Sequence, residues 1–202
     1  FPTPTRRSSD LDTILVDTGT YNTTTNIILT IQEQGLTIKG PDAVGYEAKI
    51  NRGNTGTGNY VFELINADNI TIENLTITGG RVGVYAAASS GSEYLTLLNN
   101  QFYANSTDNI YLGSSNDNAV IDNNISRNSA DGIVVESINS VVTDNKVYNN
   151  SSYGIYVRGN NFVISDNEVF ANSTGIYSNY DYGLVEANRV YSNTHTGISL
   201  SS

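Results

Sequence analysis

Residues 165–178 read SDNEVFANSTGIYS, a polar stretch without Cys, His, Lys or Arg that recurs along the chain. Nearly the same text stands one repeat earlier as TDNKVYNNSSYGIYV (143–157), and one repeat before that as IDNNISRNSADGIVV (121–135). A self-similar period of about 22 residues is typical of solenoid proteins, in which each repeat packs only against its neighbours. The repeat therefore indicates the fold class before any single residue is considered.

A self-alignment of the chain shows four recurring columns, with a period of roughly 21–26 residues that lies in the solenoid range. The first column is aliphatic and consists of Ile72, Leu97, Val120, Val142, Ile164 and Val185. The second is apolar and consists of Ile77, Phe102, Ile125, Val147, Val169 and Val190. The third holds turn residues and consists of Gly80, Asn105, Asn128, Asn150, Asn172 and Asn193. The fourth pairs Gly with an aliphatic residue, as in Gly83-Val84, Gly132-Ile133, Gly154-Ile155, Gly175-Ile176 and Gly197-Ile198, with Asn109-Ile110 as the one departure.

Each repeat holds three short runs in which apolar and polar residues alternate, separated by Asn, Asp, Gly and Ser. Alternation with period two predicts β-strands, and this region lacks the 3.6-residue spacing of helices. We therefore predict an all-β solenoid with about 22 residues and three short strands per coil, whose coils stack at roughly 4.8 Å. Asn tolerates left-handed backbone angles in a turn, and its amide can bond to the layers above and below as an asparagine ladder.

The extent of the repeat sets the expected domain boundaries. We expect residues 12–202 to form one domain, whereas the opening FPTPTRRSSDL (residues 1–11) fits no repeat and is expected not to be native to the protein. The sequence stops at Ser202 directly after an expected strand, without a polar capping segment. Because solenoid ends normally carry caps, we expect further repeats of the same parent chain at the C-terminal end.

Composition excludes several classes of function. The net charge of −10 argues against a nucleic-acid phosphate backbone as partner, and no apolar run approaches the roughly 18 residues of a membrane span. The chain has no Cys and a single histidine, His195, so no disulfide framework and no metal site is predicted. Corners rich in Asp and Asn, SSNDN (114–118) and SNYDY (178–182), can offer oxygen ligands to Ca²⁺, the one cofactor left open.

Several segments resemble a known family. DTILVDTGTY (12–21), LTIKG (36–40), ITIENLTITGG (70–80) and the recurring Gly-Ile strand are similar to right-handed parallel β-helix proteins of the pectin-lyase-like superfamily, over residues 12–202. The resemblance implies a right-handed parallel β-helix. It does not fix the function, because that fold hosts lyases, hydrolases, epimerases, tailspikes and surface stalks. The first strands resemble the N-terminal coils of large secreted or cell-surface proteins, which implies an extracellular or cell-surface location.

The resemblance places activity on the outer face of the strand that reads Gly-Ile-x-Val. The outward positions of that strand form a first row of Glu63, Tyr85, Tyr111, Val134, Tyr156, Tyr177 and Ser199. The second outward row consists of Ala87, Gly113, Glu136, Arg158, Asn179 and Ser201. Exposed tyrosine rings can stack on sugars, so the candidate ligand-binding residues are Tyr85, Tyr111, Tyr156, Tyr177 and Asn179. A purely structural role competes with this hypothesis, because tyrosines favour strands and stabilise cross-strand neighbours, and because another face carries Tyr103, Tyr148, Phe170 and Tyr191.

Each class of enzyme that uses this fold needs particular groups on the outward face. Glycoside hydrolysis needs two carboxyl groups roughly 5 or 6.5–9.5 Å apart, and the two outward rows offer only Glu63 and Glu136, three layers or roughly 14 Å apart. A lyase or epimerase needs a base and a group that neutralises a uronate carboxylate. Arg158, Tyr156 and Glu136 are the only catalytic candidates for that chemistry, and a surface ion pair between Arg158 and Glu136 is the simpler interpretation.

The sequence thus favours a non-catalytic β-helix segment of a secreted or cell-surface protein, which acts as a rigid spacer or as a weak carbohydrate-binding surface. A uronan lyase or C5-epimerase is the alternative. Loops are too short to roof a groove, although the insertion at 40–59 is expected to form a low wall beside Glu63. Polysaccharide is the expected partner, and neither nucleic acid nor a membrane span is expected.

Overall fold

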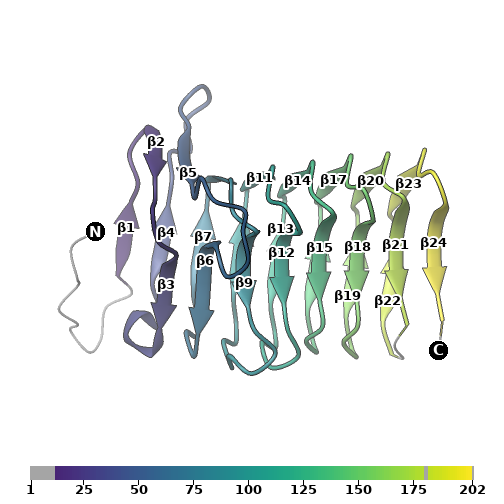
Figure 1. Cartoon of the computed structure of the whole chain (residues 1–202). Coiled ribbons are helices and arrows are strands. Elements are labelled where there is room, and N and C mark those ends of the chain that lie inside the picture. The colour runs from purple at the N-terminus through teal and green to yellow at the C-terminus, as the bar shows by residue number, and fades with distance from the viewer. Residues whose placement is uncertain (1–11, 180–181, 202) are drawn as a thin grey trace.

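The computed structural model describes residues 12–179 and 182–201, and these residues form one parallel β-helix, which confirms the predicted fold class (Figure 1). The expectation for residues 1–11 lies outside the described residues. Three parallel sheets of eight strands each run along the solenoid, and every coil contributes one strand to each sheet. The repeat is regular in the second half of the chain, where Ile121, Val142 and Ile164 pair in register on successive coils.

Sheet A consists of the first strand of each coil: β1 (Thr13–Leu15), β4 (Thr37–Lys39), β7 (Thr71–Glu73), β10 (Thr96–Leu98), β13 (Val120–Asp122), β16 (Val141–Thr143), β19 (Val163–Ser165) and β22 (Leu184–Glu186). Sheet B consists of β2 (Gly19–Asn22), β5 (Ala48–Asn51), β8 (Thr76–Thr78), β11 (Gln101–Tyr103), β14 (Ile125–Arg127), β17 (Lys146–Tyr148), β20 (Glu168–Phe170) and β23 (Arg189–Tyr191). Sheet C consists of β3 (Ile27–Thr30), β6 (Tyr60–Ile65), β9 (Val82–Ala86), β12 (Asp108–Leu112), β15 (Asp131–Val135), β18 (Tyr153–Val157), β21 (Thr174–Ser178) and β24 (Thr196–Leu200). A single 3₁₀ turn, η1 (Ile31–Glu33), is the only helical element among the described residues.

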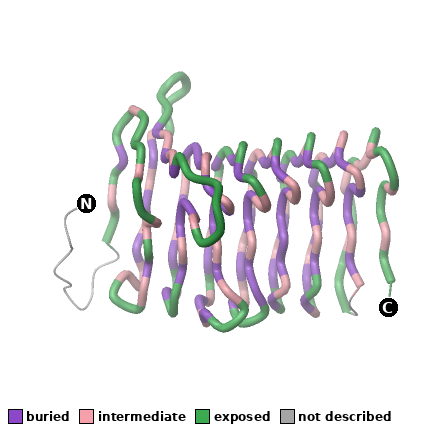
Figure 2. Tube along the Cα trace, in the orientation of Figure 1, coloured by how far each residue is buried: buried purple, intermediate pink, exposed green. Residues whose placement is uncertain are grey.

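The apolar columns point inward and form a continuous core. In sheet A, Ile72, Leu97, Val142 and Ile164 are fully buried, as the first column predicts. Figure 2 shows buried residues along the strands of the middle coils, with exposed residues on the first and last coils and in the protruding loops. Each aliphatic side chain buried in this way contributes roughly 1.5–3 kcal/mol, so the stacking of neighbouring coils stabilises each of them.

The predicted columns are wrong by one residue in the coil that spans 120–135. Ile121, not Val120, pairs with Leu97 and Val142 in the core, and Ser126, not Ile125, lies between Phe102 and Val147. In the turn column Ser129 replaces the predicted Asn128, which is exposed. The cause lies in the local sequence: Val120 and Ile121 are both aliphatic, and the aliphatic Ile125 stands beside the core position that Ser126 fills, so apolar alternation does not distinguish the two registers.

The shifted register places a serine in the core, and a second departure from the repeat compensates for it. Asn109 stands where other coils have Gly, and its Nδ2 donates to Ser126 Oγ at 3.0 Å and to the Arg127 carbonyl at 3.1 Å. Its Oδ1 accepts from Asn105 Nδ2 at 2.9 Å. Asn109 and Ser126 are both fully buried, and each satisfies the other.

A row of stacked asparagines, all buried except the half-buried Asn188 at its end, crosses the corner between sheets A and B, outside the four predicted columns. It consists of Asn100, Asn124, Asn145, Asn167 and Asn188. The backbone N–H of each member donates to the Oδ1 of the next at 2.9–3.0 Å. The side-chain amides also donate along the row, as from Asn124 to Asn145 at 3.1 Å and from Asn145 to Asn167 at 3.0 Å. We call this set the corner asparagine row.

A second set of stacked side chains crosses the corner between sheets B and C and includes Asn150, Asn172 and Asn193. At both corners the left-handed backbone angle falls on the residue before the buried asparagine. Asp144, with φ 55°, precedes Asn145, and Asn149, with φ 56°, precedes Asn150. The stacked asparagines themselves were expected to adopt this angle. In the structure two residues share these roles: the first adopts the left-handed angle that bends the chain, and the asparagine after it supplies the hydrogen bonds for the buried backbone groups.

The apolar side chains of the C-terminal coil are exposed where those of the preceding coils are buried. Ile176 is fully buried, whereas Ile198, its partner in the last coil, is 45% exposed. Leu200 in the same coil is 57% exposed, although Leu112 of the same row is fully buried. The end of the helix is therefore apolar across its core.

We expect Asn145→Ala to lower the free energy of unfolding by about 2–4 kcal/mol. The variant removes the acceptor of the Asn124 N–H and the side-chain donor to the Ile121 carbonyl in a buried corner. Urea unfolding followed by circular dichroism measures the effect. Asn54→Ala is the control, since Asn54 is exposed and accepts one local bond from Gly56. Equal losses in the two variants would contradict a special role for the row.

The Asn109 and Ser126 pair is tested by a double-mutant cycle. Ser126→Val alone is expected to cost about 1–3 kcal/mol, since the buried Asn109 amide loses an acceptor. Asn109→Gly combined with Ser126→Val restores the pattern of the other coils and is expected to cost less than the sum of the single changes. Chemical denaturation of the four proteins gives the coupling energy, expected at about 1 kcal/mol or more. Additive losses would show that the two side chains do not compensate each other.

Candidate functional site

The strand pairing of sheet C aligns the predicted first outward row. Tyr85 pairs with Tyr111, Tyr111 with Val134, Val134 with Tyr156 and Tyr156 with Tyr177. Glu63 and Ser199 occupy the two ends of the same row. Sequence alone therefore placed these residues on one face, because the Gly-aliphatic pair fixes which position of the strand points outward.

The tyrosine rings of this face form two clusters separated by Val134. The first cluster contains Tyr60, Tyr85 and Tyr111, with ring centroids 4.0 Å apart between Tyr60 and Tyr85 and 5.5 Å apart between Tyr85 and Tyr111. In the second cluster Tyr156 and Tyr177 stack at 5.3 Å with an interplanar angle of 9°. The rings therefore cover one another's faces, and their edges form the surface of each cluster. The expectation of freely exposed ring faces does not hold within either cluster.

Tyr153 completes the second cluster and was not among the candidates. Its ring tilts against Tyr156 at 5.0 Å and against Tyr177 at 5.4 Å. The repeat pattern did not select it, because it stands at the start of β18, outside the two outward rows. The second cluster thus offers three half-buried phenols within one short stretch of sheet.

The catalytic candidates are arranged as an ion pair. Arg158 Nη1 lies 3.4 Å from Glu136 Oε1 on the neighbouring coil, and the Tyr111 hydroxyl donates to Glu136 Oε2 at 3.2 Å. Burial, followed by the negative charge of Glu136, raises the pKa of Tyr111 to about 12. Burial also raises the pKa of Tyr156. Both phenols therefore stay protonated at neutral pH and act as hydrogen-bond donors, which makes Tyr156 a poor general base.

A second carboxyl pair on sheet C was missed. Asp108 and Asp131 begin β12 and β15 and pair in register on adjacent coils. Asp131 Oδ1 accepts from the Tyr153 backbone N–H at 2.8 Å. Burial, and then the charge of Asp131, raises the pKa of Asp108 to about 6, while Arg81 and a hydrogen bond from Thr107 oppose the rise. The available signal was an Asp two residues before Ile110 and Ile133. The hydrolase exclusion considered Glu63 and Glu136 alone and does not extend to this pair.

The part of the insertion 40–59 that contains Gly58 lies near Glu63, as expected. Asn26 Nδ2 donates to Glu63 Oε2 at 2.8 Å and to the Gly58 carbonyl at 3.0 Å. The buried Arg52 donates through Nε to Asn26 Oδ1 at 3.2 Å. This network fixes the loop to the N-terminal end of sheet C.

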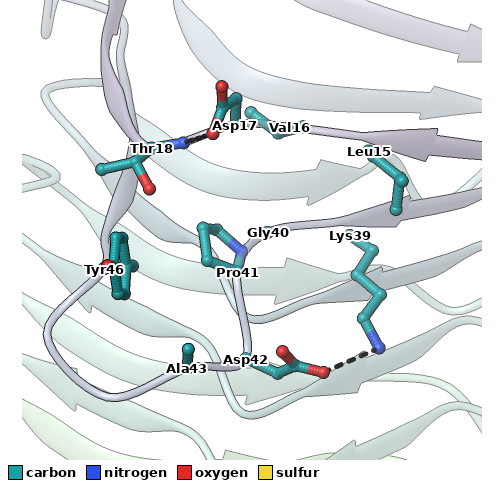
Figure 3. Close-up of a pocket in the computed structure, with 10 residues that line it drawn as sticks. All are labelled: Leu15, Val16, Asp17, Thr18, Lys39, Gly40, Pro41, Asp42, Ala43 and Tyr46. Carbon is teal, nitrogen blue, oxygen red and sulfur yellow. Dashed lines mark hydrogen bonds and ion pairs between the residues drawn. The ribbon is translucent and has the colours of Figure 1, made fainter.

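Two hollows flank the other half of the insertion, at the corner between sheets A and B. The larger, of about 510 Å³, is lined by Leu15, Val16, Asp17, Thr18, Lys39, Gly40, Pro41, Asp42, Ala43 and Tyr46 (Figure 3). Figure 3 shows the Lys39 ammonium turned toward Asp42, at 3.7 Å, and Glu73 lies 3.2 Å from the same ammonium. Tyr46 and Asp42 also line the smaller hollow of about 340 Å³. Neither hollow includes a residue of the sheet C rows.

Within residues 12–179 and 182–201, no group of three or more His, Asp or Glu side chains is placed to hold a metal ion. In the same part of the chain, no helix has the length and apolarity that crossing a membrane requires.

The pKa of Asp108 leads to a prediction for stability against pH. The folded state holds this proton more tightly than the unfolded chain, whose ordinary value is 3.8. The stabilisation is complete below pH 3.8 and is lost as the pH rises through about 6. We expect Asp108→Asn to raise the free energy of unfolding at pH 8 by on the order of 2 kcal/mol, with little change at pH 4, as measured by urea unfolding. Asp166→Asn, at an exposed corner, is the control and is expected to leave the pH profile unchanged. A parallel shift of the profile at all pH values would contradict this account.

Several solved structures share this fold. The Dettilon tailspike protein matches with a TM-score of 0.73 and 16% identity over 93% of this chain. DFA-IIIase from Arthrobacter chlorophenolicus A6, in complex with DFA-III, matches with a TM-score of 0.65 and 14% identity over 83% of this chain. Alginate lyase from Paenibacillus sp. str. FPU-7 matches with a TM-score of 0.64 and 13% identity over 96% of this chain. At these identities the likeness shows the fold alone.

The matched lengths differ between these structures. The chain spans 39% of the tailspike and 49% of the DFA-IIIase, but 94% of the alginate lyase. Comparison with curated protein sequences gives no match. The family model described as the right handed beta helix region matches residues 60–202. This match covers most of the solenoid described above, and the chain belongs to the right-handed β-helix family.

Proposed function

We propose that the protein is a non-catalytic β-helix segment of a secreted or cell-surface protein that binds a carbohydrate weakly through the outer face of sheet C. The observation that carries this proposal is the pair of tyrosine clusters on that face, which present ring edges and phenol donors along the solenoid axis. Similar folds in a tailspike, a DFA-IIIase and an alginate lyase support a carbohydrate ligand.

The polar groups beside the second cluster support the same proposal. The Oδ1 of Asn179 is buried and has no hydrogen-bond partner among the described residues. A buried acceptor without a partner is costly, and an outward turn of the Asn179 side chain would let a ligand hydroxyl group satisfy it. Asn179 directly follows β21, and the register of β18 with β21 places it beside Arg158 of the preceding coil. A sugar lying along Tyr156 and Tyr177 would therefore meet donors and an acceptor together.

Three features favour binding without catalysis. The Arg158 guanidinium is ion-paired to Glu136 and would need to leave that carboxylate to neutralise a substrate. The raised pKa of Tyr156 disfavours a phenolate base. The segments 136–140 and 158–162, which join sheet C to sheet A, are short, whereas enzymes need walls that exclude water from the reaction.

The proposal includes a setting. A straight solenoid with a continuous core is a rigid spacer, and we place it outside the cell, where polysaccharides form surfaces.

A uronan lyase or C5-epimerase is the second candidate, favoured by the match over nearly the whole length of the alginate lyase. In that case Arg158, with Ca²⁺, would neutralise the uronate carboxylate and Glu136 would accept the C5 proton. Tyr156 would donate a proton to the departing glycosidic oxygen in the lyase, or to the opposite face of C5 in the epimerase. Absorbance of unsaturated uronate products from alginate and pectate, with and without Ca²⁺, tests the lyase, and proton exchange at C5 tests the epimerase. Turnover in either assay would overturn the non-catalytic proposal.

We expect Tyr156→Ala and Tyr177→Ala to weaken retention on a glycan array by about two- to tenfold, because each removes ring edge and hydroxyl from the second cluster. The loss of one stacked pair costs roughly 0.2–1 kcal/mol of stability, so both variants should remain folded by circular dichroism.

Tyr21→Ala is the matched control, because Tyr21 is an exposed tyrosine on β2 of sheet B. It is expected to leave retention unchanged. Full retention by both sheet C variants would mean that the clusters serve stability alone.

A further inference from the structure

The outer face of sheet B carries an aligned row of planar side chains over five coils. Tyr103 pairs with Arg127, Arg127 with Tyr148, Tyr148 with Phe170 and Phe170 with Tyr191. The rings of Tyr148 and Phe170 stack at 5.0 Å and 1°, and those of Phe170 and Tyr191 stack at 5.0 Å and 8°. We call these five residues the sheet B strip. Its members cover one another's faces, so the strip presents a flat ribbon of ring edges.

Arg127 takes the place of a ring in the strip. Its guanidinium lies 4.6 Å from the centroid of Tyr103, and Tyr148 follows on the next coil. No carboxylate in the described part of the chain lies within ion-pair distance of it. Stacking holds the planar group in one orientation while its edge donors stay available, and such a guanidinium binds a carboxylate or sulfate through two hydrogen bonds.

A second source of positive charge lies beside the strip. Lys146, Glu168 and Arg189 form the adjacent outward row, and the two cations share the one carboxylate, at 2.9 Å and 3.0 Å. Lys146 and the Tyr191 hydroxyl lower the pKa of Glu168, so the carboxyl stays ionised and leaves one positive charge in excess. Lys146 also lies 5.4 Å from the Phe170 ring centroid, and Arg189 lies 4.7 Å from that of Tyr191.

The distribution of basic residues makes this face unusual for the chain. The described residues include eight Lys and Arg, and four of them, Lys49, Arg127, Lys146 and Arg189, lie on sheet B, although the whole chain carries −10. The carboxylates of Asp122, Asp144 and Glu186 lie across the corner, on sheet A and its turn. The positive band is therefore narrow and runs parallel to the solenoid axis, so that only a ligand lying along the axis avoids those acids.

We propose that the sheet B strip binds an anionic polysaccharide that lies along the solenoid axis, with an acidic group on Arg127 and a second one near Lys146 and Arg189. The three layers from Arg127 to Tyr191 span roughly 14 Å, a length suited to a polymer of several sugars. Nucleic acid fits less well, because bases need open ring faces for stacking and the rings here cover each other. This surface is separate from the sheet C face and does not depend on it.

The test is binding of the full chain to immobilised polygalacturonate (carboxylate) and dextran sulfate (sulfate), with neutral dextran as reference and a chelator present. We expect binding to both polyanions and none to dextran. Arg127→Gln is expected to weaken binding about tenfold, since it removes a charge-assisted bidentate contact. Adding Lys146→Gln should weaken it further. Raising the salt from about 20 to about 150 mM should lower affinity for the parent protein more than for the double variant.

Lys39→Gln on sheet A is the matched control, because it removes the same charge from another face, and it is expected to bind as the parent does. Tyr156→Ala is also expected to bind as the parent does. Because Tyr156 lies on sheet C, this variant distinguishes a failure of the sheet C proposal from a failure of the sheet B proposal. Equal binding by Arg127→Gln and the parent, or equal weakening by Lys39→Gln, would overturn the proposal. Tighter binding of single-stranded DNA than of either polyanion would replace polysaccharide by nucleic acid.

Discussion

The hydrogen bonds between stacked asparagines are the interaction on which the rest of the structure depends. A β-helix turns its backbone sharply inside a buried corner, where unpaired amides and carbonyls are costly. In the corner asparagine row the side chain of Asn145 satisfies the N–H of Asn124, while its own N–H is satisfied by Asn167. Each coil can thus be completed only by a neighbour in the same register, and this requirement locks every column along the axis.

The same register creates the chemistry of the outer faces. Parallel strands place like positions one layer apart, so tyrosines in one row must stack, as Tyr156 does on Tyr177. Carboxyl groups in one row must repel, and the pKa of Asp108 rises in the presence of Asp131 for this reason as well as through burial. The stacking of the rings and the raised pKa of Asp108 both result from this one geometric constraint, and neither needs a catalytic explanation.

Two faces of the solenoid differ in what they offer a ligand. Sheet C presents phenol donors, an ion pair and an acidic pair, whereas sheet B presents a planar strip with an excess of positive charge. The faces belong to separate sheets and share no side chain. Under the two proposals above, one solenoid of the right-handed β-helix family would hold two different polymers without movement between domains.

The solenoid, its three strands per coil and the outward row of sheet C can be predicted from the sequence alone, because alternation along a strand and the Gly-aliphatic pair are local signals. The sequence pattern misplaced the core positions of the coil at 120–135, because the apolar Val120 and Ile125 stand beside Ile121 and Ser126, which the structure places in the core. Three features follow from the fold and not from any local pattern. They are the hydrogen bond between Asn109 and Ser126, the adjacent positions of Asp108 and Asp131, and the stacking of the aromatic rings. These depend on turn lengths and on side chains a full coil away, which no local pattern records.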